Sequence, residues 1–166
     1  VEAYYHGPDH EDPFAHRDPI QKTHDRWYFH RRGGSYRGGS FKGLDITFGG
    51  DTAYGGLLIR SLSSISDELV NGCSLCVDRL LEEVGHGHIA ELDEAIDERT
   101  VWDTSSPLHL RPTQSSPPNQ ELLSTARVGL SLKTWTTERE DMLSFVMRPY
   151  RYLDLPTISK GKVHTI

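Results

Sequence analysis

Two charged residues lie inside short apolar segments and are the first candidates for chemistry. Glu2 is followed directly by Ala-Tyr-Tyr, and Arg60 follows Leu-Leu-Ile. Either charge would be costly to bury alone, whereas each can neutralise the other. A carboxylate poised by a neighbouring cation can act as a general base, but the same two residues can equally form a core ion pair or an edge-strand charge. From the residues alone, both interpretations stay open.

Histidines and acids gather near the start of the chain in a pattern that can bind a metal ion. The segment contains His6, Asp9, His10, Glu11, Asp12 and His16. Imidazole and carboxylate groups are common metal ligands, but a metal site holds them in fixed positions. Pro8, Pro13 and Pro19 interrupt this stretch, so we interpret it as a surface loop. A metal-binding protein is kept as an alternative, which metal analysis with a chelator control would test.

Two other motifs lack the context that their usual chemistry requires. Cys73 and Cys76 form a single C-x-x-C motif without a second pair for zinc or a thioredoxin-like surrounding, so we expect core cysteines on a helix. The glycine doublets at 33–34 and 38–39 are not a P-loop, because no Gly-Lys-Ser/Thr follows them. They bracket Ser35, Tyr36 and Arg37, and this arrangement predicts a tight turn or a hairpin tip.

Charge is distributed unevenly along the chain. The net charge of −6 argues against nucleic acid, yet residues 17–43 hold seven Lys or Arg against two Asp, and residues 78–103 hold nine acids against two Arg. The basic segment also contains Trp27, Tyr28, Phe29, Tyr36 and Phe41. Cations interleaved with aromatic rings suit phosphates and exposed bases. A solvated loop with a few core aromatics explains the same composition.

The elements that must position these residues are mostly short strands. Apolar patterning predicts strands at 1–5, 26–30, 44–48, 55–62, 100–103, 128–132 and 143–149. One helix is expected over 73–83, capped by Asn71, with a helical turn or loop at 122–126 and a surface loop at 104–121. This pattern indicates an α+β fold: a single domain over 1–166 with a curved, mostly antiparallel sheet, a few helices and a protruding hairpin.

Length and composition exclude several classes of protein. The 166 residues suit one domain, and two cysteines are too few for a disulfide scaffold. The longest aliphatic run, at 57–59, is far shorter than the ~20 residues of a spanning helix, so we expect no membrane association. No signal peptide is visible, and the chain opens inside an expected strand, so we expect the first strands of the sheet to be missing.

Several motifs occur in an order that resembles one enzyme family. The first comprises residues 2–4, 7–9 and 15–16, which read Glu-Ala-Tyr, Gly-Pro-Asp and Ala-His. The later blocks are 26–29 with the 33–34 glycines, 57–62, 74–76, 101–102, 126–130 and 145–152. Together they resemble the methylpurine (3-methyladenine) DNA glycosylases of the animal alkyladenine type. The resemblance implies base-excision repair of alkylated or deaminated purines.

This resemblance also implies roles for individual residues. Glu2 would activate the water that hydrolyses the N-glycosidic bond, and Arg60 would keep Glu2 ionised and oriented. Tyr4 would stack on the flipped base and His16 would close the base pocket. Backbone groups of Val128 and Leu130 would hold the water. We expect monofunctional hydrolysis without a metal or organic cofactor.

The chain departs from the family pattern in the segment that would enter DNA. The hairpin is shorter and richer in glycine, with Tyr36 as the best candidate for the wedge and Phe41 as the second. Asp45 takes the place where the animal enzymes carry an asparagine that screens bases. Arg31, Arg32, Arg37 and Lys42 are expected to contact phosphates.

The expected partner is double-stranded DNA containing damaged purines, bound by a monomer inside the cell, in the nucleus if the source is eukaryotic. A catalytically weak module that binds damaged DNA through the same fold is the main alternative. Excision and binding assays on the same lesion would separate the two.

Overall fold

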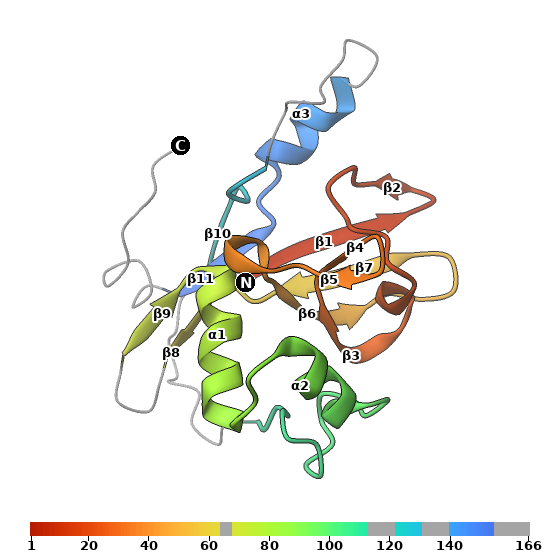
Figure 1. The fold of residues 1–166 in the computed structure, drawn as a ribbon. Coiled ribbons are helices and arrows are strands. Elements are labelled where there is room, and N and C mark those ends of the chain that lie inside the picture. The colour runs from red at the N-terminus through yellow and green to blue at the C-terminus, as the bar shows by residue number, and fades with distance from the viewer. Residues whose placement is uncertain (64–67, 113–121, 131–139, 155–166) are drawn as a thin grey trace.

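One antiparallel sheet organises the part of the chain that the computed structural model describes, which is residues 1–63, 68–112, 122–130 and 140–154. Its seven strands follow the order β10-β11-β1-β7-β6-β3, and β2 pairs with β1. Their bounds are β1 Glu2–Gly7, β2 His10–Glu11, β3 His24–Phe29, β6 Leu44–Phe48, β7 Tyr54–Leu58, β10 Leu122–Thr125 and β11 Arg151–Asp154. Strand β1 therefore lies inside the sheet, between β7 and β11 (Figure 1).

The register of this sheet brings polar residues of three strands to one face. Leu58 of β7 pairs with Glu2 of β1 and also with Asp45 of β6. Two positions earlier on β7, Gly56 pairs with Tyr4. Because side chains alternate between the two faces of a sheet, Glu2, Tyr4 and Asp45 share one face.

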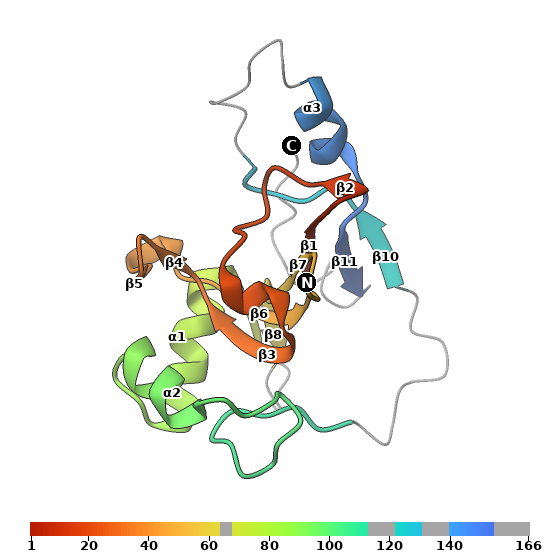
Figure 2. The same cartoon turned by 90° about the vertical axis from the view of Figure 1, so that its right-hand side faces the viewer.

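Two small hairpins flank the sheet. The first joins β4 (Arg31–Arg32) to β5 (Ser35–Tyr36) through Gly33 and Gly34, whose φ values of 57° and 82° suit glycine. Figure 2 shows this hairpin projecting from the sheet on the same side as helix α1. Its tip is formed by Gly33 and Gly34, whereas Ser35 and Tyr36, which were expected at the tip, form strand β5 and pair with β4. The second pairs β8 (Ser61–Ser63) with β9 (Leu69–Asn71). Two short 3₁₀ helices, η1 (Pro19–Lys22) and η2 (Gly39–Phe41), complete the connections.

Three helices accompany the sheet, and the α+β prediction is confirmed. Helices α1 (Cys73–Val84) and α2 (Ile89–Ile96) lie together, whereas α3 (Glu140–Met147) lies at the opposite end of the molecule (Figures 1 and 2). The main apolar core lies between α1, α2 and the sheet. It contains Trp27, Phe29, Leu44, Ile59, Cys76, Val77, Leu81, Ile89, Leu92, Ile96, Val101 and Leu108.

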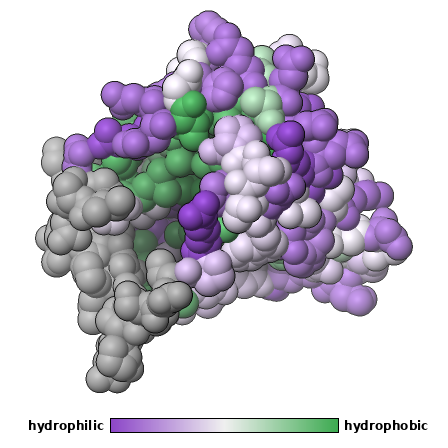
Figure 3. Space-filling view, turned by 90° about the horizontal axis from the view of Figure 1, so that it is seen from below, coloured by the Kyte–Doolittle hydropathy of each residue, from purple (hydrophilic) through white to green (hydrophobic). Residues whose placement is uncertain are grey.

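The outer surface is mixed in polarity. Figure 3 shows apolar residues gathered in one area of the face seen from below, with hydrophilic residues over most of the remaining coloured surface. None of the helices in the described part of the chain is long and apolar enough to span a bilayer.

Near the end of the chain, the sequence analysis misassigned the secondary structure. Residues 143–149 were expected to form a strand, but most of them belong to α3, and the closing strand is β11. Met142 and Phe145 are both buried, at the i, i+3 spacing of a helix. The helical turn expected at 122–126 is instead strand β10, which pairs with β11. Residues 128–130 form no strand, and 131–132 lie outside the described residues.

Several other strand and helix boundaries in the structure differ from those expected from the sequence. The strand expected at 55–62 breaks after Leu58, and the chain enters β8 only at Ser61. Thr100 forms only an isolated bridge with Arg26, so 100–103 is not a strand. Helix α1 begins after Gly72 rather than after an Asn71 cap, and α2 was not predicted.

The surface loop expected at 104–121 is only partly described. Residues 113–121 lie outside the described residues. In the described portion, Leu108 is buried and its carbonyl accepts a hydrogen bond from Trp27 Nε1 at 3.0 Å. This portion therefore packs against the core and is not a free surface loop.

Helix α2 supplies a fully buried core residue, Leu92, which offers a test of this packing. Leu92→Ala should lower the free energy of unfolding by about 2–5 kcal/mol, because it leaves a cavity among packed side chains. Urea denaturation followed by circular dichroism measures the change. The matched control is Leu75→Ala on α1, which is 55% exposed and should change stability by less than about 0.5 kcal/mol. Equal effects of the two variants would contradict the assigned core.

Candidate active site

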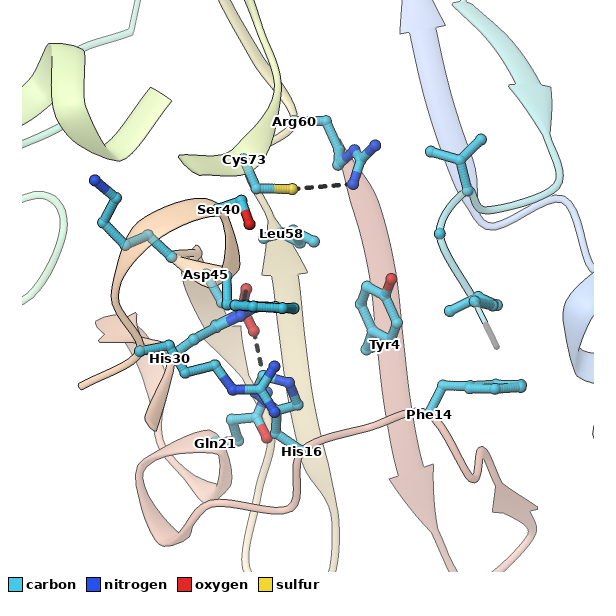
Figure 4. Close-up of a pocket in the computed structure, with 16 residues that line it drawn as sticks. Tyr4, Phe14, His16, Gln21, His30, Ser40, Asp45, Leu58, Arg60 and Cys73 are labelled. Carbon is cyan, nitrogen blue, oxygen red and sulfur yellow. Dashed lines mark hydrogen bonds and ion pairs between the residues drawn. The ribbon is translucent and has the colours of Figure 1, made fainter. Parts of the chain in front are cut away.

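An open cavity of about 460 Å³ lies over the face that carries Tyr4 and Asp45. Its lining comes from β1, the loop before η1, β6, β7, η2, the start of α1 and residues 128–130. Figure 4 shows Tyr4 on one side of the gap and His30 and Asp45 on the other, with Arg60 and Cys73 toward one end and His16 toward the other. The volume is within the range of small-ligand sites in proteins.

Glu2 lies beneath this cavity with no exposed surface. Its Oε1 accepts a hydrogen bond from the Val128 backbone N–H at 3.0 Å, and its Oε2 accepts one from the Tyr4 hydroxyl at 2.9 Å. Arg60 Nε is 3.7 Å from Oε1 and Arg151 Nε is 3.9 Å from the same oxygen. The structure thus brings together Glu2 and Arg60, as expected from the sequence, and adds a second guanidinium from β11.

Tyr4 connects the carboxylate to the cavity. Its ring lines the cavity while its hydroxyl donates to Glu2. Burial, and then the charge of Glu2, raise the pKa of Tyr4, so the hydroxyl stays protonated as a donor. On another side, the Arg127 guanidinium lies 4.4 Å from the ring centroid, a cation–π distance.

Arg127 forms a buried ion pair that the sequence analysis did not identify. Nη1 and Nη2 donate to the two carboxylate oxygens of Asp12 at 2.5 and 3.2 Å, and both side chains have no exposed surface. Arg127 also donates to the carbonyls of Ala3 and Phe145. It therefore joins β1, the loop after β2 and α3, next to the Val128 N–H that binds Glu2. The available signal was a lone arginine in the apolar run 126–130, the same feature that drew attention to Arg60.

One partner of this ion pair, Asp12, belongs to the candidate metal loop. Its carboxylate is bonded to Arg127, and its backbone carbonyl bonds to His6 Nδ1 at 3.0 Å. His10 lies against Arg148, with its Nδ1 3.1 Å from Arg148 Nη1. Within the described ranges, no group of three or more His, Cys, Asp or Glu side chains is arranged to hold a metal ion. The geometry therefore provides no support for the metal-binding alternative.

The opposite wall of the cavity is a polar network centred on Asp45. This carboxylate is 2% exposed; Oδ1 is 2.7 Å from His30 Nε2, and Oδ2 accepts from Gln21 Nε2 at 3.1 Å. Gly56 makes room for the network, because a Cβ there would lie 2.4 Å from Asp45 Oδ2. The glycine in β7 is therefore part of how the wall is built.

His16 stands at the mouth of the cavity, beside this wall. Its ring is 4.2 Å from the ring of His30, and its Nδ1 is 3.3 Å from the Tyr28 hydroxyl. Desolvation by surrounding side chains, and then the neighbouring His30, lower the pKa of His16 to about 4. At neutral pH the ring is therefore uncharged and can offer a donor or an acceptor to a ligand.

A thiol completes the end of the cavity near Arg60. Arg60 Nη1 lies 3.0 Å from Cys73 Sγ, and this contact orients the guanidinium beside Glu2. Burial raises the pKa of the Cys73 thiol, so the group is neutral at ordinary pH. Cys76 is buried in the core, as expected for a helix cysteine, whereas Cys73, which was also expected in the core, is only partly buried and lines the cavity.

The predicted DNA-contacting residues divide into two groups. Tyr36 donates its hydroxyl to Asp93 of α2 at 2.6 Å, and Arg31 lies over its ring and bonds to the same carboxylate at 2.6 Å. Lys42 forms an ion pair with Asp78 of α1. The acidic segment therefore neutralises part of the basic one.

The remaining members of the set are more accessible. Phe41, at the end of η2, is 71% exposed and lines the cavity rim together with Arg37. Arg32 is exposed at the tip of the β4–β5 hairpin. Of the two candidate wedge residues, Phe41 is therefore the exposed one, whereas Tyr36 is held by Asp93.

The fold and the site define an α+β domain with a buried, hydrogen-bonded carboxylate beneath an open polar and aromatic cavity. No family model and no solved structure matches the chain. The chain is 32% identical over 183 residues to the uncharacterized protein L759 of Acanthamoeba polyphaga mimivirus, an alignment that covers 100% of this chain and 79% of the viral protein. It belongs to the same family as this viral protein.

The buried Asp12–Arg127 pair offers a test of how the site is held. Asp12→Asn should lower the free energy of unfolding by about 3–5 kcal/mol, because it leaves the Arg127 charge buried and unpaired. Thermal and urea unfolding measure the loss. Asp9→Asn, which changes an exposed acid in the same loop, is the matched control and should be nearly neutral. Equal stability of the two variants would show that Arg127 does not depend on Asp12.

Proposed function

We propose that this protein is a monofunctional DNA glycosylase that flips a damaged purine into the cavity and hydrolyses its N-glycosidic bond. The observation that carries the proposal is the position of Glu2: a buried carboxylate oriented by Val128 and Tyr4 beneath a base-sized cavity, with the Arg60 and Arg151 guanidinium groups beside it. The proposal includes double-stranded DNA as partner, a monomer without metal or organic cofactor, and action inside the cell, in the nucleus of a eukaryotic source.

In the proposed reaction, Glu2 accepts a proton from a water molecule as the water oxygen bonds to C1′ of the sugar. The C1′–N bond breaks, and its electron pair leaves with the base. The negative carboxylate also stabilises the positive charge that develops on the sugar. Because a base that already carries a positive charge leaves with less help, neutral lesions should depend more strongly on Glu2.

The cavity contains the parts that such a reaction needs. The Tyr4 ring provides a stacking surface, and His16 and Asp45 provide polar groups for the base. Val128 and Leu130 also line the cavity, and the Val128 N–H donates to Glu2. Lys42 lines the cavity as well, but its ammonium group pairs with Asp78, which favours water rather than an amine as the nucleophile.

On the DNA side, we propose Phe41 as the wedge that fills the gap left by the flipped base. Its exposure at the cavity rim supports this role, whereas the Tyr36 hydroxyl is bound to Asp93. Arg32 and Arg37 are the cations best placed to contact phosphates near the wedge. Such contacts would release counterions and make binding weaken with salt.

The complete burial of Glu2 favours a second candidate, a module that binds damaged DNA without turnover. Both carboxylate oxygens already have donors, and the side chain has no exposed surface. In that case the cavity binds the flipped base while water cannot reach the carboxylate. The two candidates differ in excision and not in lesion binding.

Glu2→Gln tests the proposal directly. The variant keeps an acceptor for the Val128 N–H but removes the base, so lesion binding should be nearly unchanged and single-turnover excision should fall by roughly 10²-fold or more. Excision is measured on duplexes containing 3-methyladenine, 7-methylguanine, hypoxanthine or ethenoadenine. Glu11→Gln, which changes an exposed carboxylate on β2, is the matched control and should retain full activity.

The contrary outcomes are distinct. Wild-type excision rates in folded Glu2→Gln would refute the catalytic role of Glu2. Tight lesion binding by the wild-type protein without any excision would establish the binding module instead. Absence of both lesion binding and excision would refute both candidates.

The wedge assignment makes a separate prediction. Phe41→Ala should reduce the flipped population by at least about tenfold, since the wedge offsets an unstacking cost of a few kcal/mol. Fluorescence of a 2-aminopurine base placed beside the lesion reports the flipped state. Tyr36→Ala is the comparison variant, because it removes the other candidate ring. If Tyr36→Ala reduced the flipped population more than Phe41→Ala, Tyr36 and not Phe41 would be the wedge.

A further inference from the structure

The cavity wall opposite Tyr4 is built around a carboxylate, and this feature bears on which bases can bind. Asp45 is the one carboxylate among the described residues that line the cavity. It lies on the same sheet face as Tyr4, with Gly56 of β7 between the two strands. Gly56 leaves room for the carboxylate, because a Cβ there would lie 2.4 Å from Asp45 Oδ2, and Figure 4 shows Asp45 and Tyr4 on opposite sides of the cavity.

The hydrogen bonds of Asp45 define its chemistry. An ionised carboxylate only accepts hydrogen bonds and has about four acceptor positions. His30 occupies one on Oδ1 and Gln21 occupies one on Oδ2. Both oxygens therefore keep acceptor capacity, and the packing of His30 and Gln21 fixes the carboxylate in place.

The other polar groups near the wall do not set the same requirement. The neutral His16 can present either a donor or an acceptor according to its tautomer. Gln21 uses Nε2 on Asp45 and Oε1 on the backbone N–H of Asp18. Among the described residues that line the cavity, Asp45 is thus the acceptor-only side chain, whereas Arg37, Lys42 and Arg60 can only donate.

We infer that Asp45 determines the substrate class: the cavity selects damaged purines that present N–H donors or a positive charge to this wall, and disfavours neutral bases that present only acceptors. This inference rests on the proposed function and specifies its substrate. A base with a ring N–H or an amino group completes the hydrogen bonding of Asp45. If the base instead presents an acceptor atom, the lone pairs of that atom and of the carboxylate repel each other. The buried Asp45 carboxylate then gains no hydrogen bond from the base.

Two lesions separate the classes. 7-Methylguanine carries a positive charge and presents ring N–H and amino donors, whereas ethenoadenine is neutral and has no N–H on its base-pairing edge. The N-glycosidic bonds of the two lesions also differ in intrinsic strength. The informative quantity is therefore the ratio of the two excision rates, and this ratio is compared between wild type and Asp45→Asn. The asparagine amide can donate as well as accept, and it removes the negative charge with little change in shape.

The experiment measures single-turnover excision of both lesions by wild type and Asp45→Asn. The ratio of 7-methylguanine to ethenoadenine excision should fall at least about tenfold in the variant, through both a gain on ethenoadenine and a loss on 7-methylguanine. Dissociation constants for the same duplexes, measured in Glu2→Gln and in Glu2→Gln/Asp45→Asn, should show the same change in ratio without bond cleavage. Asp9→Asn, which changes an exposed carboxylate outside the cavity lining, is the control and should leave the ratio unchanged.

The outcomes distinguish this inference from the function on which it rests. Unchanged ratios in proteins that excise or bind lesions would overturn the role of Asp45 and leave the glycosylase intact. Absence of lesion binding and excision in wild type would overturn both. Asp45→Ser serves as a second variant if Asp45→Asn unfolds, because serine also supplies a donor; an unchanged ratio there would overturn the inference equally.

Discussion

Burial of the Glu2 carboxylate is the constraint on which the rest of the site depends. A carboxylate removed from water is strongly destabilising unless it receives hydrogen bonds and opposite charge. Here the partners come from four places: Tyr4 two residues away, Arg60 after β7, Arg151 on β11 and the Val128 backbone. These segments must converge for the carboxylate to be compensated, so the central strands and the segment 126–130 are energetically linked.

The second buried pair, Asp12–Arg127, holds that segment in place. Its guanidinium bonds to a carboxylate and two carbonyls, one from β1 and one from α3, and its Cζ lies 4.4 Å from the centroid of the Tyr4 ring. Arg127 thereby connects α3, which lies at the far end of the molecule, to the strand that carries Glu2 and Tyr4. The Glu2–Arg60 pair lies beneath the cavity, and the Asp12–Arg127 pair supports the residues around it.

Charge separation along the chain is resolved in three dimensions. The acidic helices α1 and α2 supply Asp78 and Asp93, which pair with Lys42 and Arg31 of the basic segment. These contacts secure η2 and the β4–β5 hairpin against the helices. They reduce the free positive charge of this face while leaving Phe41 exposed at the cavity rim. A net charge of −6 therefore coexists with an aromatic and partly basic edge.

The sequence by itself determined what depends on neighbouring residues: the strands near 1–5, 26–30 and 44–48, helix α1, a hairpin in the glycine-rich segment though not the position of its tip, and Glu2 and Arg60 as charges in apolar segments. Periodicity failed for the two eight-residue helices, because about two turns are too short for the apolar pattern to distinguish a helix from a strand: α2 was not predicted and α3 was predicted as a strand. Only the tertiary structure determined which residues the buried charged side chains pair with. Asp12 and Arg127 are 115 residues apart, and the Asp45 wall needs Gln21, His30 and Gly56 from three other segments. Such pairings depend on sheet register and side-chain packing between distant segments, which local patterns do not encode.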